Sequence, residues 1–305
     1  MNVDGKMSKS KAYITSFRLR TLPLSVSGVL LGTLLAASDG NFKPWAFAWA
    51  IVTTMALQIL SNLANEVGDL EKGTDNEKRL GPIRSVQSGA LSKREMIRAM
   101  LFFGGMAIVT GSLLVYDAFG DLLDLKSIIL LLVGGASIVA AVKYTVGDHA
   151  YGYRGLGDLF VFIFFGLVSV LGSYFAMAGH LPWITLFPAV SIGLLSTGVL
   201  NMNNIRDMEN DATCGKRTIP VMLGIRGAKT YHFILIVTAL ACMVLYTVFH
   251  PNGRIGYLFI LTFPLFGMHL VKVYHGKGKN LDPQLKFLSL STLLLTLLVV
   301  IGQIR

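Results

Sequence analysis

Two groups of carboxylate and amide side chains in this chain have matching spacing. Each begins with Asn-x3-Asp and ends in a further Asp: Asn65, Asp69 and Asp75 in the first group, and Asn203, Asp207 and Asp211 in the second. Residues four apart on a helix lie on one face, with Cβ atoms about 5–6 Å apart. Their oxygens can therefore converge on a hard cation such as Mg²⁺, whose shell is completed by water and substrate phosphates.

An isolated acidic group beside an apolar segment is usually solvated or paired with a nearby lysine. Two groups of the same spacing, with Asn203 following Asn65 by 138 residues, instead favour a paired site. We predict that all six residues bind metal and that Asp69, Asp207 and Asp211 are catalytic. The neighbouring glutamates do not share the spacing, so we expect them to be solvated: Glu66, Glu71, Glu77 and Glu209.

A basic tract that contains glycine follows each group, at residues 78–89 and 215–220. Cations that are already in place stabilise the charge that develops on a departing diphosphate. The basic and polar side chains in and beside these tracts are therefore predicted to bind a diphosphate: Lys72, Arg79, Arg84, Gln87, Ser88, Lys216 and Arg217.

A third polar segment, KYTVGDHAYGYRGLGD at residues 143–158, combines tyrosines and cations with glycines and Asp158. One interpretation is an interfacial aromatic belt with turns. The other is a wall of the same pocket, in which tyrosine hydroxyls and cations face phosphate or an aromatic acceptor. Its glycines do not form GxGxxG after a strand, so a dinucleotide-binding fold is not indicated.

The elements that position these side chains are predicted to be membrane helices. Of the 305 residues, 53% are hydrophobic and only 14% are charged, and the mean hydropathy is +0.61. Soluble domains carry about 25% charged residues, and a spanning helix needs about 20 apolar residues. The chain is therefore predicted to be an all-α integral membrane protein with nine transmembrane helices, at about 22–38, 45–66, 96–116, 125–143, 159–179, 183–203, 230–249, 255–272 and 286–304.

The distribution of lysine and arginine predicts the orientation. With the N-terminus inside, only four of the 27 lie outside: Lys43, Lys126, Arg254 and Arg305. This bias predicts a cytoplasmic N-terminus and an outside C-terminus. It also accounts for the net charge of +10 without a nucleic-acid partner. The basic residues before the first apolar segment are expected to precede a retained helix rather than a cleaved signal.

Three longer stretches resemble one known family. NEVGDLEKGTDNEKRLGPIRSVQSGALS (65–92), YTVGDHAYGYRGLGDLFVFIFFG (144–166) and NMNNIRDMENDATCGKRTIPVMLG (201–224) are similar to the UbiA-type aromatic prenyltransferases, and within them to the branch that uses 1,4-dihydroxy-2-naphthoate. The superfamily pattern is NDxxDxxxD. Here Glu66 and Gly73 replace two of its aspartates and Asp75 follows, an ending that looks like the naphthoate branch. Whether Asp75 reaches metal directly or through water stays open.

The resemblance implies a helical bundle around a central cavity, with one domain over residues 1–305 in two Asp-rich halves, about 17–146 and 147–305. It implies transfer of a polyprenyl group from polyprenyl diphosphate to 1,4-dihydroxy-2-naphthoate, with loss of CO2 and diphosphate, to give demethylmenaquinone for menaquinone synthesis. The cofactor would be Mg²⁺, and the location a bacterial cytoplasmic (inner) membrane with the site facing the cytoplasm.

With these substrates, two roles can be named. The acceptor would be bound by Arg20, Tyr144, Tyr151 and Arg154, with Tyr144 and Asp158 as catalytic candidates; none is singled out as the base. Arg20 could equally be a positive anchor of the first helix. The tail could lie along Phe160, Phe162, Phe164 and Phe165, for which packing against lipid or core is the alternative.

Two other functions fit parts of the sequence. One is a prenyltransferase with another aromatic acceptor. The other is an ion-coupled secondary transporter, which should place carboxylates near the middle of broken helices. The acids here fall at the ends of apolar segments beside basic tracts, which favours phosphate chemistry. Chain length, oligomeric state, metal number and the proton acceptor are not predicted.

Overall fold

The computed structural model describes residues 8–251 and 255–303, and every regular element in these ranges is helical. The first half of the chain contains α1 (Lys9–Phe17), η1 (Leu19–Thr21), α2 (Leu22–Ser38), α3 (Pro44–Glu71), α4 (Lys93–Phe119) and α5 (Leu125–Lys143). The second contains η2 (Tyr151–Tyr153), α6 (Gly157–Val161), η3 (Phe162–Val168), α7 (Ser169–Ala178), η4 (Trp183–Thr185), α8 (Leu186–Thr213), α9 (Ile219–Phe249), η5 (Ile255–Thr262), α10 (Phe263–His275), η6 (Gly278–Leu281) and α11 (Asp282–Gln303).

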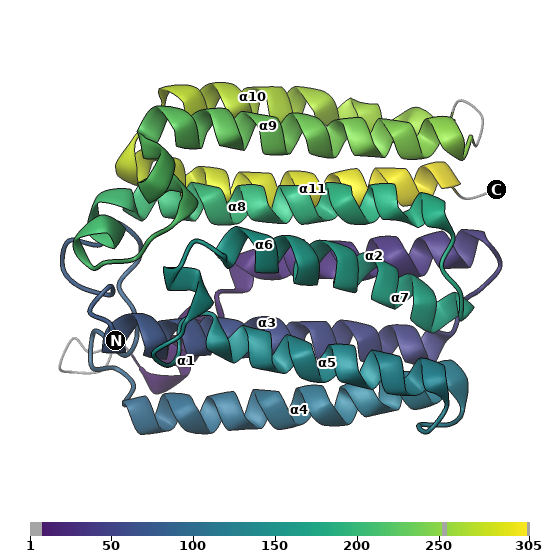
Figure 1. Cartoon of the computed structure of the whole chain (residues 1–305), viewed down its shortest axis with the longest axis horizontal. Helices are drawn as coiled ribbons and strands as arrows, with labels where there is room; N and C mark the ends of the chain where they lie inside the picture. Colours follow the sequence, from purple (N-terminus) through teal and green to yellow (C-terminus); the bar gives the residue numbers. More distant parts are fainter. Residues whose placement is uncertain (1–7, 252–254, 304–305) are drawn as a thin grey trace.

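The predicted set of apolar helices is confirmed. Nine helical stretches within the described ranges are long and apolar enough to cross a membrane: Lys9–Ser38, Pro44–Glu71, Lys93–Phe119, Leu125–Lys143, Gly157–Ala178, Trp183–Thr213, Ile219–Phe249, Ile255–His275 and Gly278–Gln303. They run side by side, with α4 along one edge and α9 and α10 along the other (Figure 1). The first helix α1 and the last turn of α11 lie at opposite ends of the bundle (Figure 1).

The ends of two helices differ from the prediction. The apolar segments were expected to stop at about residues 66 and 203, but α3 continues to Glu71 and α8 to Thr213. Hydropathy detects the part of a helix that lies in lipid, whereas the helix itself continues until the backbone changes direction. Asp69, Asp207 and Asp211 therefore lie on the helices themselves, whereas Asp75 follows the end of α3.

The last turns of α3 and α8 have the same backbone geometry. Gly73 and Gly215 adopt left-handed conformations with φ of 71° and 70°. The next amide in each case donates back into the helix, from Thr74 to the Asp69 carbonyl and from Lys216 to the Asp211 carbonyl, both at 2.9 Å. This closing turn favours glycine because the left-handed conformation is strained for other residues. By backbone position Asp69 therefore corresponds to Asp211. The Asn-x3-Asp spacing had matched Asp69 to Asp207, which lies one helical turn earlier.

Small residues let helices approach closely in a membrane, so the glycine pairs in two predicted helices are candidates for close helix contacts. The pairs at 104–105 and 134–135 have no backbone of another helix within 4 Å of an added Cβ. A Cβ on Gly166 would instead lie 2.4 Å from the Cα of Gly193, so η3 and α8 touch backbone to backbone.

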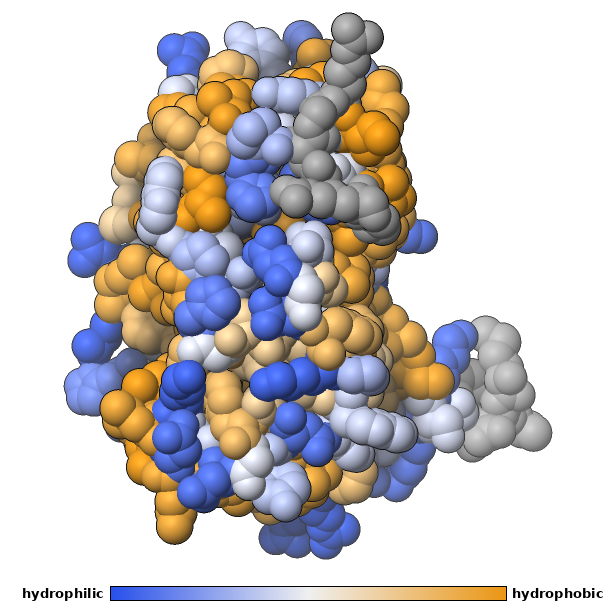
Figure 2. Space-filling view, turned by 90° about the vertical axis from the view of Figure 1, so that its right-hand side faces the viewer, coloured by the Kyte–Doolittle hydropathy of each residue, from blue (hydrophilic) through white to orange (hydrophobic). Residues whose placement is uncertain are grey.

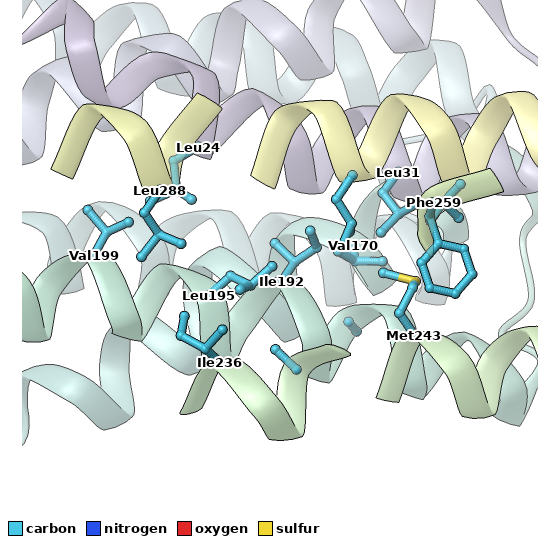
Figure 3. Packing of buried hydrophobic residues seen from close by; sticks show 14 of the residues in the cluster. Leu24, Leu31, Val170, Ile192, Leu195, Val199, Ile236, Met243, Phe259 and Leu288 are labelled. Atoms are coloured by element: carbon cyan, nitrogen blue, oxygen red, sulfur yellow. The ribbon is translucent and has the colours of Figure 1, made fainter. Parts of the chain in front are cut away.

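The main core fills the space among α2, α7, α8, α9, η5 and α11. Buried aliphatic side chains such as Leu31, Val170 and Leu195 interlock there with Phe259 and Leu288 (Figure 3). This half of the bundle is the more tightly filled part, and it holds α8 in place. Figure 2 looks onto the end of the molecule opposite α1, where hydrophilic residues occupy the end face and hydrophobic residues cover the flanks.

Candidate active site

A cavity of about 550 Å³ opens between the helices and joins two different environments. Its polar part is lined by predicted site residues from both halves: Arg20, Asn65, Asp69, Arg79, Arg84, Tyr144, Tyr151, Asn203, Asp207, Asp211 and Lys216. Its apolar part continues along α4, α5, η3 and α7, past Ile108, Gly134 and Phe164. Ile108, which lines this apolar part, is 58% exposed on the flank of the bundle. The cavity therefore reaches the surface that faces lipid.

Lys216 joins the two halves of the polar part. Its Nζ lies 3.5 Å from Oδ1 of Asp69 on α3 and 4.0 Å from Oδ1 of Asp211 on α8. Burial opposes the charged ammonium, but the carboxylates of Asp69, Asp211 and Asp207 outweigh it and raise the pKa of Lys216. Lys216 therefore stays charged between two carboxylates that come from different halves of the chain.

Tyr153 contacts the same cluster and was not singled out from the sequence. Its hydroxyl donates to Oδ1 of Asp69 at 2.8 Å and lies 2.6 Å from the hydroxyl of Thr74. Two ammonium groups contact the ring, with the Nζ of Lys72 and of Lys216 at 5.0 and 5.1 Å from its centroid. The neighbouring Tyr151 was favoured instead, because the sequence of η2 does not tell which tyrosine turns toward the acid.

Arg206 holds Asp207, and this arginine was also missed. Its Nε and Nη2 donate to the two carboxylate oxygens of Asp207 at 3.0 and 2.6 Å, and Nη2 donates to Oδ1 of Asn203 at 2.8 Å. Its Nη1 donates to Oδ1 of Asp282 at 2.6 Å, and Arg20 contacts the other oxygen of Asp282 at 3.2 Å. This bidentate geometry fixes the orientation of Asp207. Arg206 had been attributed to the inside-positive bias.

Asp75 lies behind the cavity wall and organises the basic tract. Its side chain is 0% exposed, and its two oxygens lie 3.1 Å from Nε of Arg79 and 3.6 Å from Nε of Arg84. Burial raises the pKa of Asp75, with Arg84 opposing this effect and Asp69 adding to it. Burial lowers the pKa of Arg84. Since Asp75 does not line the cavity, its place fits a residue that positions two arginines better than one that contacts metal directly.

Three residues of the first basic tract do not line the cavity. The Nζ of Lys72 donates to the carbonyl of Gly147 at 2.9 Å, which ties the end of α3 to the loop after α5. The carboxamide oxygen of Gln87 accepts from the Arg84 amide, and Ser88 is exposed and donates to the Ser85 carbonyl. Local turn bonds therefore use the polar groups that we had assigned to diphosphate.

Two residues of the later loops, and Asp158 on α6, also lie outside the cavity lining. Arg154 is exposed and contacts Nδ1 of His149, and Arg217 is exposed beside the closing turn of α8. Asp158 is buried, but it interacts with the Tyr231 hydroxyl rather than lining the cavity. A loop sequence shows which residues are polar without showing which of them turn inward.

Glu66 is buried, contrary to the solvated position that we expected. It is 1% exposed, and Oε1 accepts from the Val86 amide at 2.9 Å. Glu66 therefore fastens the basic tract to α3. The helix continues beyond the predicted end, and this places Glu66 inside the bundle.

Aromatic side chains cover one side of the cavity. Tyr151 stacks on Phe160 with centroids 3.9 Å apart and meets Tyr144 edge-to-face at 5.3 Å. Of the four phenylalanines proposed for a tail groove, Phe160, Phe164 and Phe165 line the cavity. Phe162 packs against Gly193 instead. Tyr144, Tyr151 and Phe160 thus give the cavity an aromatic lining, which suits an aromatic ligand.

Residues 25–294 match the UbiA prenyltransferase family. The chain belongs to that family. It is 41% identical over 280 residues to the 1,4-dihydroxy-2-naphthoate octaprenyltransferase of Escherichia coli (strain K12), covering 92% of this chain and 89% of the relative. Membership in a family of prenyltransferases leaves ion-coupled transport without support.

Solved UbiA structures share the fold at low sequence identity. The apo structure of a UbiA homolog from Aeropyrum pernix K1 has a TM-score of 0.68 and 19% identity, over 95% of this chain and 96% of that one. A UbiA homolog from Archaeoglobus fulgidus bound to GPP and Mg²⁺ has a TM-score of 0.58 and 15% identity, over 93% and 99%. The helical bundle predicted from the sequence is thus confirmed as a UbiA fold.

The oxygen donors of this UbiA chain are of a kind that suits Mg²⁺. Among the described residues no three histidine, cysteine or acidic side chains form a ready-made metal cluster. Mg²⁺ does not require one, because it usually takes one or two carboxylates and keeps water and substrate phosphates as its other ligands. Asp69, Asp207 and Asp211 all present hard oxygens to one cavity.

Proposed function

We propose that this UbiA-family protein transfers a polyprenyl group from polyprenyl diphosphate to 1,4-dihydroxy-2-naphthoate, with release of CO2 and diphosphate, to form demethylmenaquinol, the hydroquinone form of demethylmenaquinone. The observation that carries the proposal is the cavity, in which carboxylates and cations at one end continue into an apolar and aromatic channel. Such a site fits a substrate with a charged head and a lipid-like tail. The similarity to the Escherichia coli octaprenyltransferase supports the acceptor.

The charged head would be bound from both halves of the chain, about residues 17–146 and 147–305. Mg²⁺ would be held by Asp69, Asp207 and Asp211, with the amide oxygens of Asn65 and Asn203 beside them, and would neutralise charge on the diphosphate. Arg79, Arg84 and Lys216 line the same region and stabilise the leaving group as the allylic C–O bond breaks.

The acceptor provides its own leaving group on the ring. The allylic carbon loses its bonding electrons to diphosphate, and the electron-rich ring carbon that bears the carboxylate bonds to it. The C–C bond to the carboxylate then breaks, CO2 leaves, and its electron pair restores the aromatic ring. Charge balances without a proton leaving the ring, so the base that we left unassigned between Tyr144 and Asp158 is not required. Tyr144 and Tyr151 would instead hold the ring flat.

The location of the protein follows from its apolar helices, its bacterial relatives and the distribution of its lysines and arginines. The protein is a multi-pass membrane protein with bacterial relatives. We place it in the bacterial cytoplasmic membrane with the charged end of the cavity facing the cytoplasm, because this orientation leaves few lysines and arginines outside.

A direct assay tests the function. Membranes containing the protein are incubated with Mg²⁺, a polyprenyl diphosphate and either 1,4-dihydroxy-2-naphthoate or 4-hydroxybenzoate. We expect a prenylated naphthohydroquinone, detected as the quinone after oxidation in air, together with stoichiometric CO2 from the first acceptor and no product from the second. Prenylation of the benzoate alone would overturn the acceptor assignment.

A further inference from the structure

Arg18 occupies a backbone position that normally favours glycine. It closes α1 in the left-handed conformation, with φ of 50° and ψ of 54°, and its amide donates to the Thr15 carbonyl at 3.2 Å. Among the described residues it is the only one other than glycine with a positive φ. Helices commonly end this way with glycine, because a Cβ is strained there. Strain that persists in a folded protein often marks a functional residue.

The side chain of Arg18 also lacks partners. Its Nε and Nη2 are buried and have no hydrogen-bond partner among the described residues. Arg18 lines the cavity that holds the two acidic groups. A buried donor without a partner is unfavourable, so the guanidinium is expected to meet an acceptor that enters the cavity.

The neighbouring Arg20 shows the contrast. It lines the same cavity, but its Nη1 contacts a carboxylate oxygen of Asp282 at 3.2 Å, and Asp282 also binds Arg206. Arg20 therefore has a structural partner, whereas Arg18, two residues earlier, does not. Of the two arginines, Arg18 is therefore the one with donors left for an anion that enters the cavity.

The charges around Arg18 indicate which anion it meets. The side chains that act on it most strongly are Arg84 and Arg79, which repel it, followed by Glu66 and Asp75, which attract it. Arg18 therefore lies beside the two arginines, Arg79 and Arg84, that line the cavity with it and that we assign to the leaving group. Carboxylates of Glu66, Asp75, Asp69 and Asp207 also lie near these three guanidinium groups. The choice of a diphosphate as ligand therefore follows from the place of Arg18 beside Arg79 and Arg84. The planar donor pair of a guanidinium also matches phosphate oxygens.

We propose that Arg18 binds the diphosphate of the prenyl substrate through Nε and Nη2, and that the strained end of α1 holds it toward the cavity. This inference rests on the proposed function, because it takes prenyl diphosphate as the ligand. It extends the diphosphate subsite beyond the two tracts that follow the acidic groups, to the helix that opens the chain.

The position allows an experiment that separates folding from binding. Glycine tolerates the backbone of residue 18, so Arg18→Gly removes the cation while favouring the same turn. Arg18→Lys keeps the charge but not the planar donor pair. Lys11→Gln is the matched control, since it removes an exposed cation from the same helix.

We expect Arg18→Gly to retain or raise the thermal midpoint of the detergent-solubilised protein, and to raise the KM for prenyl diphosphate about 10- to 100-fold, the loss of one charge-assisted contact. The KM for 1,4-dihydroxy-2-naphthoate should change less than twofold. Arg18→Lys should fall between wild type and Arg18→Gly, and Lys11→Gln should match wild type.

A second readout does not depend on the acceptor. Inorganic diphosphate with Mg²⁺ should raise the thermal midpoint of wild type, and this protection should be weakened in Arg18→Gly. Equal protection in both proteins would overturn the proposal, and so would a rise in the acceptor KM alone, which would place a carboxylate at Arg18. Failure of wild type to prenylate the naphthoate would refute the proposed function, while the protection assay would still decide the role of Arg18.

Discussion

The last turns of α3 and α8 bring carboxylates into one cavity from the two halves of the chain. Both helices end at a left-handed glycine, and in both the carbonyl of the last aspartate in the helix accepts the closing hydrogen bond. In this respect Asp69 and Asp211 are equivalent. The side chains beside them are neutralised in different ways.

The cations of the first half come from residues that follow the helix. Arg79 and Arg84 lie in the loop after α3 and converge on Asp75. In the second half Arg206 lies within α8 itself and binds the adjacent Asp207. Lys216 contacts acids of both halves. Arg79 does so as well, since its Nη2 lies 3.6 Å from Oδ2 of Asp207.

This difference suggests a division of labour between the halves. The loop after α3 contributes guanidinium groups that can change partner when a diphosphate enters. The pair of Arg206 and Asp207 is anchored by Asp282 of α11 and keeps one carboxylate in a fixed place. A similar backbone turn thus supports an adaptable set of charges on one side and a fixed set on the other.

The largest expected effect tests whether the two carboxylates at equivalent turns act together. Asp69→Asn and Asp211→Asn should each lower kcat/KM by about 10³-fold or more, because several kcal/mol of charge stabilisation by the metal depend on them. Glu209→Gln, an exposed acid on α8, is the control and should retain activity. Chelation of Mg²⁺ should reduce wild type to the level of the variants. Full activity of either asparagine variant would show that Asp69 and Asp211 do not act together.

The next effect distinguishes fixed from adaptable cations. Arg206→Gln removes both contacts to buried Asp207, and breaking a buried pair costs about 3–5 kcal/mol, so the thermal midpoint should fall by several degrees. Arg79→Gln should lower it much less, since Asp75 keeps Arg84. The measurement is the unfolding midpoint of each protein in the same detergent. Equal losses would show that the halves do not differ in this way.

A smaller effect tests Lys216 as the link between the halves. Lys216→Met should lower kcat/KM for prenyl diphosphate about 10- to 100-fold, the contribution expected of one charge-assisted contact. Lys72→Met is a matched control, because Lys72 contacts the same Tyr153 ring but does not line the cavity. Similar losses in both variants would point to the ring contact rather than to the carboxylates.

The smallest effect tests the equivalence of the two turns. Gly73→Ala and Gly215→Ala meet no atom within 4 Å, so each should lose only the stability that the left-handed conformation requires. That loss is about 1 kcal/mol for each, and the two unfolding midpoints should agree. A much larger loss at one glycine would show that its turn has an additional role.

The sequence was sufficient to predict the helices and the acidic residues that recur at helical spacing at the ends of apolar segments. Nine apolar segments and the Asn-x3-Asp groups are patterns along the chain, and a helix converts such patterns directly into faces. Asp69, Asp207 and Asp211 therefore reach the cavity as expected.

The remaining site residues depend on contacts between distant segments. Tyr153 and Tyr151 look alike in the sequence, and only the fold of η2 directs one hydroxyl to Asp69. In the sequence Arg206 looks like any other cation at the cytoplasmic end of a helix. Its structural role depends on the contact with Asp282, which belongs to α11. Gln87 and Ser88 appeared to be free polar groups, but in the turn that follows Arg84 the Gln87 carboxamide oxygen accepts from the Arg84 amide and the Ser88 hydroxyl donates to the Ser85 carbonyl.

The cavity leads from its charged end to the flank at Ile108, and this determines how substrate enters and product leaves. Under the proposed function, both the prenyl substrate and its product are lipids, and neither has to cross water to reach the site. Supply and release then take place in the plane of the bilayer. The enzyme would sense the density of prenyl lipid in its own leaflet, and a tail longer than the cavity could extend into the membrane without hindering the reaction.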